Sequence, residues 1–594
     1  MKTTLTRRGL IAAMPALASA GVLAGCGGGG NSTVVADATP TPTPTTPTTT
    51  TTTTPTTTVA ANPNDVALKF DATAFTTVNV TLDGVALAVR QYRIVYVAKP
   101  IRFAMTQTSL SGATTTLADP FAYQTMIVSV AESLAGDQTR PIYMVVNNAG
   151  WFNSPVATSI TAGAAFVSTS DTDAIGSALK AGYVVVNVGS RGRGARAADG
   201  RWAGKAPAAI VDTKAAIRYL RLNDSLMPGT ASRIVLTGTS GGGGLVAAVS
   251  ASGNSGDHLP FLADIGAAGV AGSNATATST LKDDVFAVVA YCPINNLGNA
   301  DAGYEWEYNP VRSDANTPAL NGVAYSAGPQ PAASAAIAAT FPAYLGGLNL
   351  IREDGSALTA ANLRDSTLAQ VRREIQAQIA KGTAVPALGA SFTIPGSMGA
   401  AGTAVVNDWL TLTGTGTTAT VAAIDYNRYL KFVTTIRALK TVVAFDATGV
   451  NGNTAVSGET NLFGSDAFAY SNFTEWSWNN NQVRGDGSGT DDTGLGFSAY
   501  LAANVNNLAT QIRLINPLAY LNTTADTAPF WYVRHGMIDR DTAFAMQLVL
   551  YHAIRRDTKV KEVDFKIPYL VPHSGNYDVQ EAFAWVKARL AANP

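Results

Sequence analysis

The sequence predicts an α/β fold in which helices flank a mostly parallel sheet. Short apolar runs with the length of buried strands lie at residues 142–146, 183–188, 234–236 and 285–291. A helical pattern at residues 207–222 separates the second run from the third, and its apolar side chains fall towards one side. Strands that alternate with helices form βαβ units, and such units build a parallel sheet.

A pair of antiparallel strands is expected before these units. Residues 78–82 and 89–97 alternate apolar and polar side chains, and Asp83-Gly84 between them is typical of a tight turn. We therefore expect the globular part of the chain to begin near residue 63.

Length, composition and charge limit the possible functions. The chain has 594 residues, more than one ordinary domain needs, so a core with a large insertion is expected. The 41 Lys and Arg residues balance 41 Asp and Glu residues, so no overall field attracts nucleic acid. The two cysteines and four histidines form no zinc-type pattern, and we expect neither a metal nor a cofactor.

The first 26 residues are typical of an export signal rather than of folded structure. Arg7-Arg8 resembles a twin-arginine region, and a short apolar stretch follows at residues 10–23. Leu23-Ala24-Gly25-Cys26 resembles a bacterial lipobox, in which Cys26 would carry lipid. The alternatives are an ordinary secretory signal with an incidental cysteine, and export by the general secretory route. We expect an exported protein that is lipid-anchored to a bacterial membrane.

Residues 27–62 are rich in Gly, Thr and Pro and have almost nothing apolar to bury. Such a segment cannot offset its ordering entropy, so we expect a disordered stalk. If Cys26 carries lipid, Cys292 has no partner for an intrachain disulfide. Cys292 follows an apolar run and is expected to be a buried, inert thiol.

A nucleophile is indicated by Gly238-Thr239-Ser240-Gly241-Gly242, which fits the pattern G-x-S-x-G. A strand-like run at residues 233–237 precedes it, and a helix-compatible stretch follows at residues 244–249. A nucleophile elbow holds its serine on a strained turn between strand and helix, so small neighbours are needed. The alternative is a glycine-rich turn with an incidental serine. The flanking elements favour Ser240 as the nucleophile of an α/β-hydrolase core.

His573 is the predicted base, chosen from only four histidines. In this fold the acid and then the histidine follow the serine along the chain. His258 is expected at the surface and His552 within a helix, while His535 precedes the candidate acids and so lies in the wrong order. His573 follows an apolar run near the C-terminus, where a loop leaving a late strand is expected.

Asp539 is the predicted acid that orients the imidazole. An apolar run beginning at Phe530 opens into a loop that contains Asp539 and Asp541. Asp539 comes first after the strand, whereas Asp541 could also cap the helix that follows.

The oxyanion hole is expected to combine two backbone N–H groups. Gly241 begins the helix after the nucleophile, where its N–H can donate to developing negative charge. The loop after residues 142–146 offers the N–H of Ala149 or Gly150 as the second donor.

With these pieces placed, the chain resembles the bacterial tannases of subtype B, the tannin acyl hydrolases. The resemblance covers most of the chain after the stalk. It is carried by the elbow and the His573 loop together with several longer stretches: residues 204–212 (GKAPAAIVD), 219–224 (YLRLND), 291–294 (YCPI), 299–301 (NAD), 304–306 (YEW) and 534–541 (RHGMIDRD).

The resemblance implies hydrolysis of galloyl esters by a triad of Ser240, Asp539 and His573. In such enzymes a Lys, a Glu and an Asp hold the three ring hydroxyls, and the matching positions here are Lys440, Glu459 and Asp541. Carboxylates accept phenolic O–H groups and an ammonium pairs with phenol oxygens. The alternatives are a solvated helix-end cation for Lys440 and an ordinary loop carboxylate for Glu459.

Two features depart from the family pattern. Gly241 stands where Ala is familiar, which is expected to matter little. The Gly- and Asn-rich stretch between Lys440 and Glu459 looks longer than usual, which bears on the assignment of Glu459 and on substrate specificity.

The spacing of the triad predicts the domain organisation. Ser240 and Asp539 lie about 300 residues apart, far more than neighbouring strands need. We expect core residues 63–311 and 501–594 with an inserted lid at residues 312–500. Four aromatic residues of the lid could clamp a phenolic ring or form the lid's own core: Tyr470, Phe473, Trp476 and Trp478.

The predicted partners are a small phenolic ester and, through the lipid anchor, a membrane. The predicted mechanism forms a covalent acyl-enzyme on Ser240, which water then hydrolyses. A feruloyl esterase or a broad carboxylesterase is the alternative enzyme. A non-catalytic surface lipoprotein that binds polyphenol or carbohydrate is the alternative of another class, and the complete set of Ser240, Asp539 and His573 argues against it.

Overall fold

A ten-stranded mixed sheet forms the centre of the molecule. The computed structural model describes residues 62–108, 114–394, 402–454, 458–483 and 493–593. The strand order is β18-β17-β12-β9-β6-β8-β5-β2-β1-β7. The strands are β1 (Thr76–Leu82), β2 (Val85–Val95), β5 (Thr125–Ala131), β6 (Ile142–Val146), β7 (Ala165–Phe166), β8 (Val184–Val188), β9 (Ile234–Thr239), β12 (Ala287–Tyr291), β17 (Phe530–Arg534) and β18 (Glu562–Lys566).

The predicted fold class is confirmed. The six strands from β8 to β18 along the sheet run parallel, and each of the four apolar runs in the sequence overlaps one of them. The predicted antiparallel pair is β1 and β2, joined at Asp83-Gly84. The predicted helix is α3 (Ala208–Leu222).

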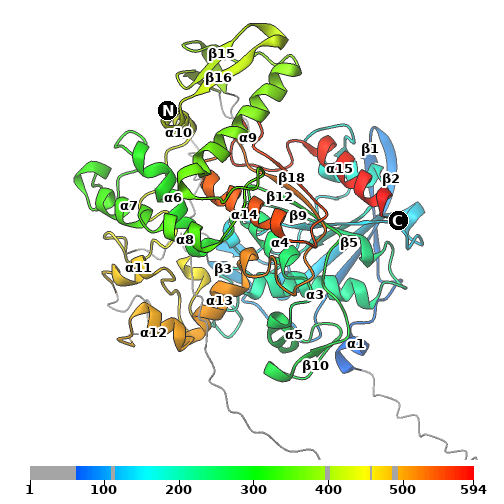
Figure 1. Cartoon of the computed structure of the whole chain (residues 1–594). Coiled ribbons are helices and arrows are strands. Elements are labelled where there is room, and N and C mark those ends of the chain that lie inside the picture. The colour runs from blue at the N-terminus through cyan, green and yellow to red at the C-terminus, as the bar shows by residue number, and fades with distance from the viewer. Residues whose placement is uncertain (1–61, 109–113, 395–401, 455–457, 484–492, 594) are drawn as a thin grey trace, which may run out of the picture.

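Helices cover both faces of this sheet (Figure 1). Alternate side chains of each central strand enter different cores, since successive residues of a strand point to opposite faces. Val184 and Val186 pack in the same core as α3, α4 (Gly241–Ala251) and α14 (Phe544–Arg556). Val185 packs in the core beneath α2 (Ala174–Lys180) and α15 (Val579–Ala592).

The chain leaves the sheet at Tyr291 and returns to the neighbouring strand at Phe530. In Figure 1 α9, β15 and β16 of this excursion project away from the sheet. Within the excursion α9 begins at Ala360, where Thr359 and Asn362 form a capping box. The helices and strands of the excursion between Tyr291 and Phe530 are α6 (Ala300–Tyr308), α7 (Gln330–Ala338), α8 (Phe341–Gly347), α9 (Ala360–Ala380), β13 (Ser391–Ile394), β14 (Thr403–Val406), β15 (Leu410–Thr413), β16 (Thr420–Ile424), α10 (Tyr426–Ile436), α11 (Glu475–Asn479), α12 (Phe497–Ala502) and α13 (Leu508–Leu514).

The core also contains two short helices and two short pairs of strands. They are α1 (Pro63–Ala67), α5 (Leu259–Asp264) and two short strand pairs, β3 (Thr106–Thr108) with β4 (Thr114–Thr116) and β10 (Val270–Ala271) with β11 (Thr278–Ser279). The predicted signal, Cys26 and the stalk lie outside the described residues. Across the part of the chain that the structure describes, no helix is both long and apolar enough to cross a membrane.

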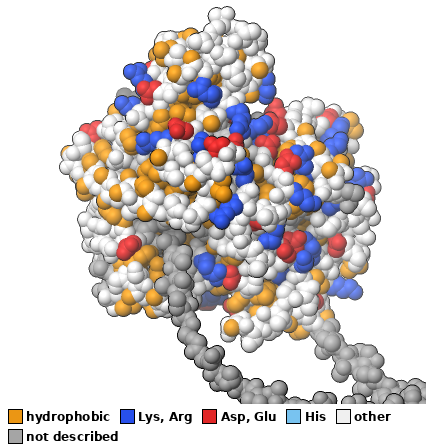
Figure 2. Space-filling model, viewed as in Figure 1, with side chains coloured by type: hydrophobic (Ala, Val, Ile, Leu, Met, Phe, Trp, Pro, Cys, Tyr) orange, Lys and Arg blue, Asp and Glu red, His pale blue; other side chains and the backbone are white. Residues whose placement is uncertain are grey.

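The face shown in Figure 2 mixes basic and acidic side chains, in keeping with the balanced composition. One prediction about a histidine is wrong: His258 is fully buried rather than at the surface. Its ring packs against Tyr520, and burial, with a smaller contribution from Lys214, lowers the pKa of His258 to about 3. His552 lies within α14, as expected, and is buried there.

Candidate active site

Ser240 occupies the sharp turn between β9 and α4. Its backbone angles, φ 61° and ψ −122°, are strained for a residue with a side chain. The turn is packed so closely that a Cβ added at Gly238 would lie 2.4 Å from the carbonyl oxygen of Gly242. The Ser240 N–H donates to the carbonyl of Tyr291, 2.9 Å away, which ties the turn to the neighbouring strand β12.

Three predicted residues from distant parts of the chain form one hydrogen-bonded row. The Ser240 Oγ lies 2.8 Å from His573 Nε2, and His573 Nδ1 lies 2.7 Å from Asp539 Oδ2. Asp539 follows β17 and is fully buried, while His573 lies in the loop after β18 and is partly exposed. The parallel arrangement of β9, β17 and β18 brings these loops to the same edge of the sheet.

The charge balance of this row favours a protonated imidazole. Burial by itself would lower the pKa of His573, but Asp539, Cys292 and Asp541 raise it well above its ordinary value. Burial by itself would raise the pKa of Asp539, but the two histidines beside it, His573 and His535, lower that pKa below its ordinary value. The carboxylate therefore stays ionised and stabilises positive charge on the ring.

Two neighbours of the row were not predicted to have any part in the site. His535 Nδ1 lies 3.4 Å from Asp539 Oδ2, and burial lowers the pKa of His535 to about 4. Cys292 is buried as predicted, but its Sγ lies 3.9 Å from His573 Nε2. Chain order excluded His535 as the base, but His535 precedes Asp539 by only four residues, which brings its ring beside the acid.

Cys292, Asp539 and His573 place three possible metal-ligand atoms within 4.8 Å of one another. A thiol binds metal as the thiolate. Burial raises the pKa of the Cys292 thiol, and its S–H donates to the carbonyl of Ser574 at 3.3 Å. Both nitrogens of His573 are already engaged with Ser240 and Asp539. This donor set therefore does not fit a metal.

The candidate oxyanion donors lie at the turn after β6. The Ala149 N–H donates to the carbonyl of Asn147 at 2.9 Å, which removes Ala149 from the two alternatives. Gly150 adopts a left-handed conformation with φ 56°. Its nitrogen would lie only 2.7 Å from a Cβ added at Gly241, so the two glycine backbones approach closely. The Cβ would also lie 2.3 Å from the nitrogen of Trp151, so the glycine at 241 matters more than expected.

The positions matched to galloyl recognition also come together. Lys440 is influenced electrostatically by both Asp541 and Glu459, and burial lowers the pKa of Lys440 to about 8. Its N–H donates to the hydroxyl of Tyr304, and its carbonyl accepts from Arg312. Among the described residues no acceptor binds its ammonium, which faces the ring of Phe445 at 4.1 Å. Lys440 is thus no solvated helix-end cation.

Glu459 is a fully buried carboxylate on a short 3-10 helix, Gly458–Leu462. Its Oε2 lies 3.0 Å from Arg193 Nη1, yet neither carboxylate oxygen accepts a well-directed hydrogen bond from the described residues. Burial raises the pKa of Glu459 to about 8. Buried polar atoms without hydrogen-bond partners are rare in folded proteins, so this carboxylate stands out among the buried side chains.

Asp541 connects this group to the hydrogen-bonded row of Ser240, His573 and Asp539. Its N–H donates to Asp539 Oδ1 at 2.8 Å, and its own carboxylate lies 4.0 Å from His573 Nδ1. Arg437 and Arg540 pair with the two oxygens of Asp541. The alternative role as a helix cap does not apply, because the N-cap of α14 is Ala543.

The four aromatic residues of the excursion divide unevenly. Tyr470, Phe473 and Trp478 are buried in the core and so fit the alternative of a structural role. Trp476 is half-buried and lines a cavity of about 390 Å³ that also includes Asp301 and Val443.

Known proteins resemble this chain over most of its length. A tannin acyl hydrolase from Lactobacillus plantarum is 30% identical, with a TM-score of 0.66, over 88% of this chain and 98% of that chain. The same values hold for a tannin acyl hydrolase in complex with ethyl gallate. The chain belongs to the tannase family.

Further comparisons agree with this membership. A tannase from Fusobacterium nucleatum is 28% identical, with a TM-score of 0.64, over 88% of this chain and 99% of that chain. A family model described as BD-FAE matches residues 141–327 of this tannase-family chain. A comparison with curated proteins finds no match. As a member of the tannase family, the protein is a carboxylic ester hydrolase.

Proposed function

We propose that the protein hydrolyses galloyl esters by nucleophilic catalysis at Ser240. The observation that carries this proposal is the row from Ser240 Oγ through His573 to Asp539, with hydrogen bonds of 2.8 and 2.7 Å. A serine hydroxyl is a weak nucleophile unless a base adjoins it and a third group orients that base. This row has that arrangement.

The proposed reaction begins when His573 Nε2 takes the proton of Ser240 as Oγ attacks the ester carbonyl. The N–H groups of Gly150 and Gly241 stabilise the negative oxygen of the tetrahedral intermediate. The bond to the alcohol oxygen then breaks, and His573 returns its proton to the leaving alcohol. Water, deprotonated by His573, releases the acid from the acyl-enzyme in the same way.

We assign recognition of the acyl group to Lys440, Glu459 and Asp541. The carboxylates can accept phenolic O–H groups, and the ammonium can donate to a phenol oxygen. Relatives have been solved in complex with ethyl gallate and with 3,4-dihydroxybenzoate, which supports a hydroxylated aromatic acid as the acyl group. A site with buried polar groups rejects rings that lack hydroxyls, because those groups would then be left unpaired.

We also propose that residues 312–500 form a lid over the site, and that export and lipidation at Cys26 place the enzyme on a bacterial membrane. Contacts between the excursion and the core support the lid. Arg437 pairs with Asp541 at 2.7 Å, and Tyr429 donates to the carbonyl of Met537 at 2.6 Å. The anchor rests on the sequence pattern around Cys26 alone.

Three esters test this proposal and its alternatives. Purified wild type and Ser240→Ala are compared on methyl gallate, methyl ferulate and p-nitrophenyl acetate. We expect wild type to turn over methyl gallate best and Ser240→Ala to turn over none. Turnover of methyl ferulate without turnover of methyl gallate would make the protein a feruloyl esterase. If the wild type hydrolysed none of the three esters, the proposed catalytic activity would be contradicted.

A further inference from the structure

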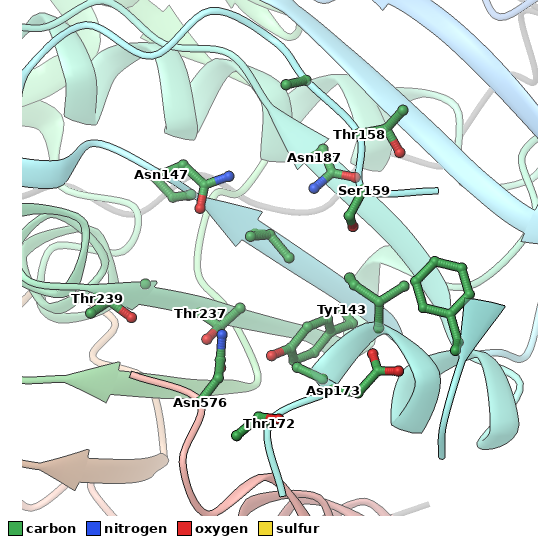
Figure 3. A pocket seen from close by; sticks show the side chains of 17 residues that line it. Tyr143, Asn147, Thr158, Ser159, Thr172, Asp173, Asn187, Thr237, Thr239 and Asn576 are labelled. Atoms are coloured by element: carbon green, nitrogen blue, oxygen red, sulfur yellow. The ribbon is translucent and has the colours of Figure 1, made fainter. Parts of the chain in front are cut away.

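A second cavity lies on the opposite face of the sheet from α4. It has a volume of about 530 Å³, within the range of roughly 300–1,000 Å³ that is usual for small-molecule sites. Its wall includes β6, β8 and β9, the start of α2, the loop around residues 157–159 and Asn576 (Figure 3). Asn147 at its mouth is exposed, so the cavity opens to solvent.

The chemistry of the wall is polar but almost uncharged. Figure 3 shows amide and hydroxyl side chains on several sides of the space: Asn147, Ser159, Asn187, Thr237, Thr239 and Asn576. The seventeen described lining residues include no Lys, Arg or His. Their only carboxylate, Asp173, already accepts the N–H groups of Val167 and Gly176 at 2.7 Å.

Asn187 adds an amide side chain to the wall of this space. It interrupts the apolar strand β8, and its side chain is 4% exposed. Its Oδ1 has no hydrogen-bond partner within the described structure. That oxygen is shielded from solvent and does not itself face the open space, but an amide on a strand of valines costs free energy that a further valine would avoid at a purely structural position.

The apolar part of the wall limits the ligand further. Phe166 and Val145 line the cavity beside Tyr143, and Val145 is half-buried although it lies on a central strand. Burial raises the pKa of Tyr143 to about 12, so its hydroxyl stays a neutral donor. Amides and hydroxyls both donate and accept, as the hydroxyl groups of a sugar do. Apolar and aromatic side chains suit the C–H faces of the same molecule.

We infer that this cavity binds an uncharged polyhydroxylated molecule of monosaccharide size. Both segments that carry the triad contribute to its wall, since Thr239 precedes Ser240 and Asn576 follows His573 by three residues. These segments touch: a Cβ added at Gly575 would lie 2.1 Å from Thr239 Oγ1. The site is nevertheless separate from the triad, and its occupancy does not depend on the proposed hydrolysis.

Calorimetric titration of the Ser240→Ala protein with D-glucose and with sorbitol tests the inference without turnover. We expect saturable binding of at least one polyol with a millimolar Kd. Two variants in the Ser240→Ala background probe the wall: Asn187→Leu removes the amide, and Val145→Phe fills the space. Each should weaken polyol binding at least tenfold. Val85→Phe, at a valine that is 69% exposed, is the matched control and should bind as before.

Methyl gallate distinguishes the two sites. It should bind the Ser240→Ala protein near the triad, and Val145→Phe should leave that binding unchanged. Melting temperatures show whether each variant is folded. The inference is overturned if neither polyol binds at 50 mM, if the folded Val145→Phe variant binds polyol normally, or if methyl gallate competes with the polyol.

Discussion

The elbow around Ser240 and the segment 437–474 form two parts of the proposed site, but they are built in different ways. The elbow is continuous: β9, a strained turn and α4, held by glycine backbones in direct contact. The segment 437–474 carries Lys440 and Glu459 and has little regular structure, with one 3-10 helix as its only helical element in the described residues.

Buried carboxylates hold the segment 437–474 in place. Asp301 accepts the N–H groups of Phe445 and Asp446 at 2.8 and 2.9 Å. Asp446 in turn accepts the N–H of Phe473 and the side-chain amide of Asn472. The elbow thus depends on close packing of backbones, whereas the segment depends on buried hydrogen bonds, some within it and some to Asp301, more than a hundred residues earlier. The elbow should determine the rate of hydrolysis of every ester, and the segment 437–474 should determine which esters are preferred.

The largest expected effect concerns the base. His573→Ala should reduce kcat/KM for every ester by roughly 10⁴–10⁶-fold, because neither attack nor protonation of the leaving group retains a proton carrier. Steady-state rates on methyl gallate and p-nitrophenyl acetate measure this. His258→Ala, which removes a buried histidine remote from the triad, is the control and should affect stability more than rate. Equal rates for the two variants would exclude His573 as the base.

Gly241→Ala tests the close packing of the elbow. The added Cβ would lie 2.3 Å from the nitrogen of Trp151, so the loop with the second oxyanion donor must move. Loss of one such donor costs roughly 10²–10³-fold in kcat, and both esters should lose activity alike. Gly256→Ala is the matched control, since nothing lies within 4 Å of its added Cβ. A Gly241→Ala enzyme with wild-type rates would contradict the oxyanion assignment.

Lys440→Met tests the other part of the comparison. The variant keeps the length of the side chain and removes the charge, so kcat/KM for methyl gallate should fall by roughly 10–100-fold, the worth of a hydrogen bond to a charged group. The rate on p-nitrophenyl acetate should change little. Lys431→Met on the exposed side of α10 serves as the control. Equal losses on both esters would make Lys440 a structural residue.

The smallest expected effect is a shift in pH dependence. His573 must be neutral to act as a base, and its pKa is raised, so the rising limb of kcat/KM should lie above pH 6.5. The Asp541 carboxylate contributes to the raised pKa of His573. Asp541→Asn removes the negative charge and lowers the pKa of His573, so the limb should move to lower pH by roughly half a unit to one unit. p-Nitrophenyl acetate is the suitable substrate, and a shift to higher pH would refute this coupling.

Much of the fold and part of the site could be predicted from the sequence. Apolar runs became β6, β8, β9 and β12 because a strand buried on both faces requires apolar residues throughout. Ser240 could be found because the elbow is a local motif, in which strand, turn and helix follow one another within a few residues. The order of Ser240, Asp539 and His573 also follows from the order of strands in such a sheet.

Tertiary structure alone decided which distant side chains meet. The sequence gives no signal that His258 is buried, that Cys292 adjoins His573, or that Arg193 pairs with Glu459. The same holds for the second cavity, whose wall includes both Asn187 and Asn576. Local sequence patterns reflect interactions between residues that are close in the chain, and these interactions determine strands, helices and turns. Contacts between residues hundreds of positions apart depend on how those elements pack, and that geometry exists only in the folded protein.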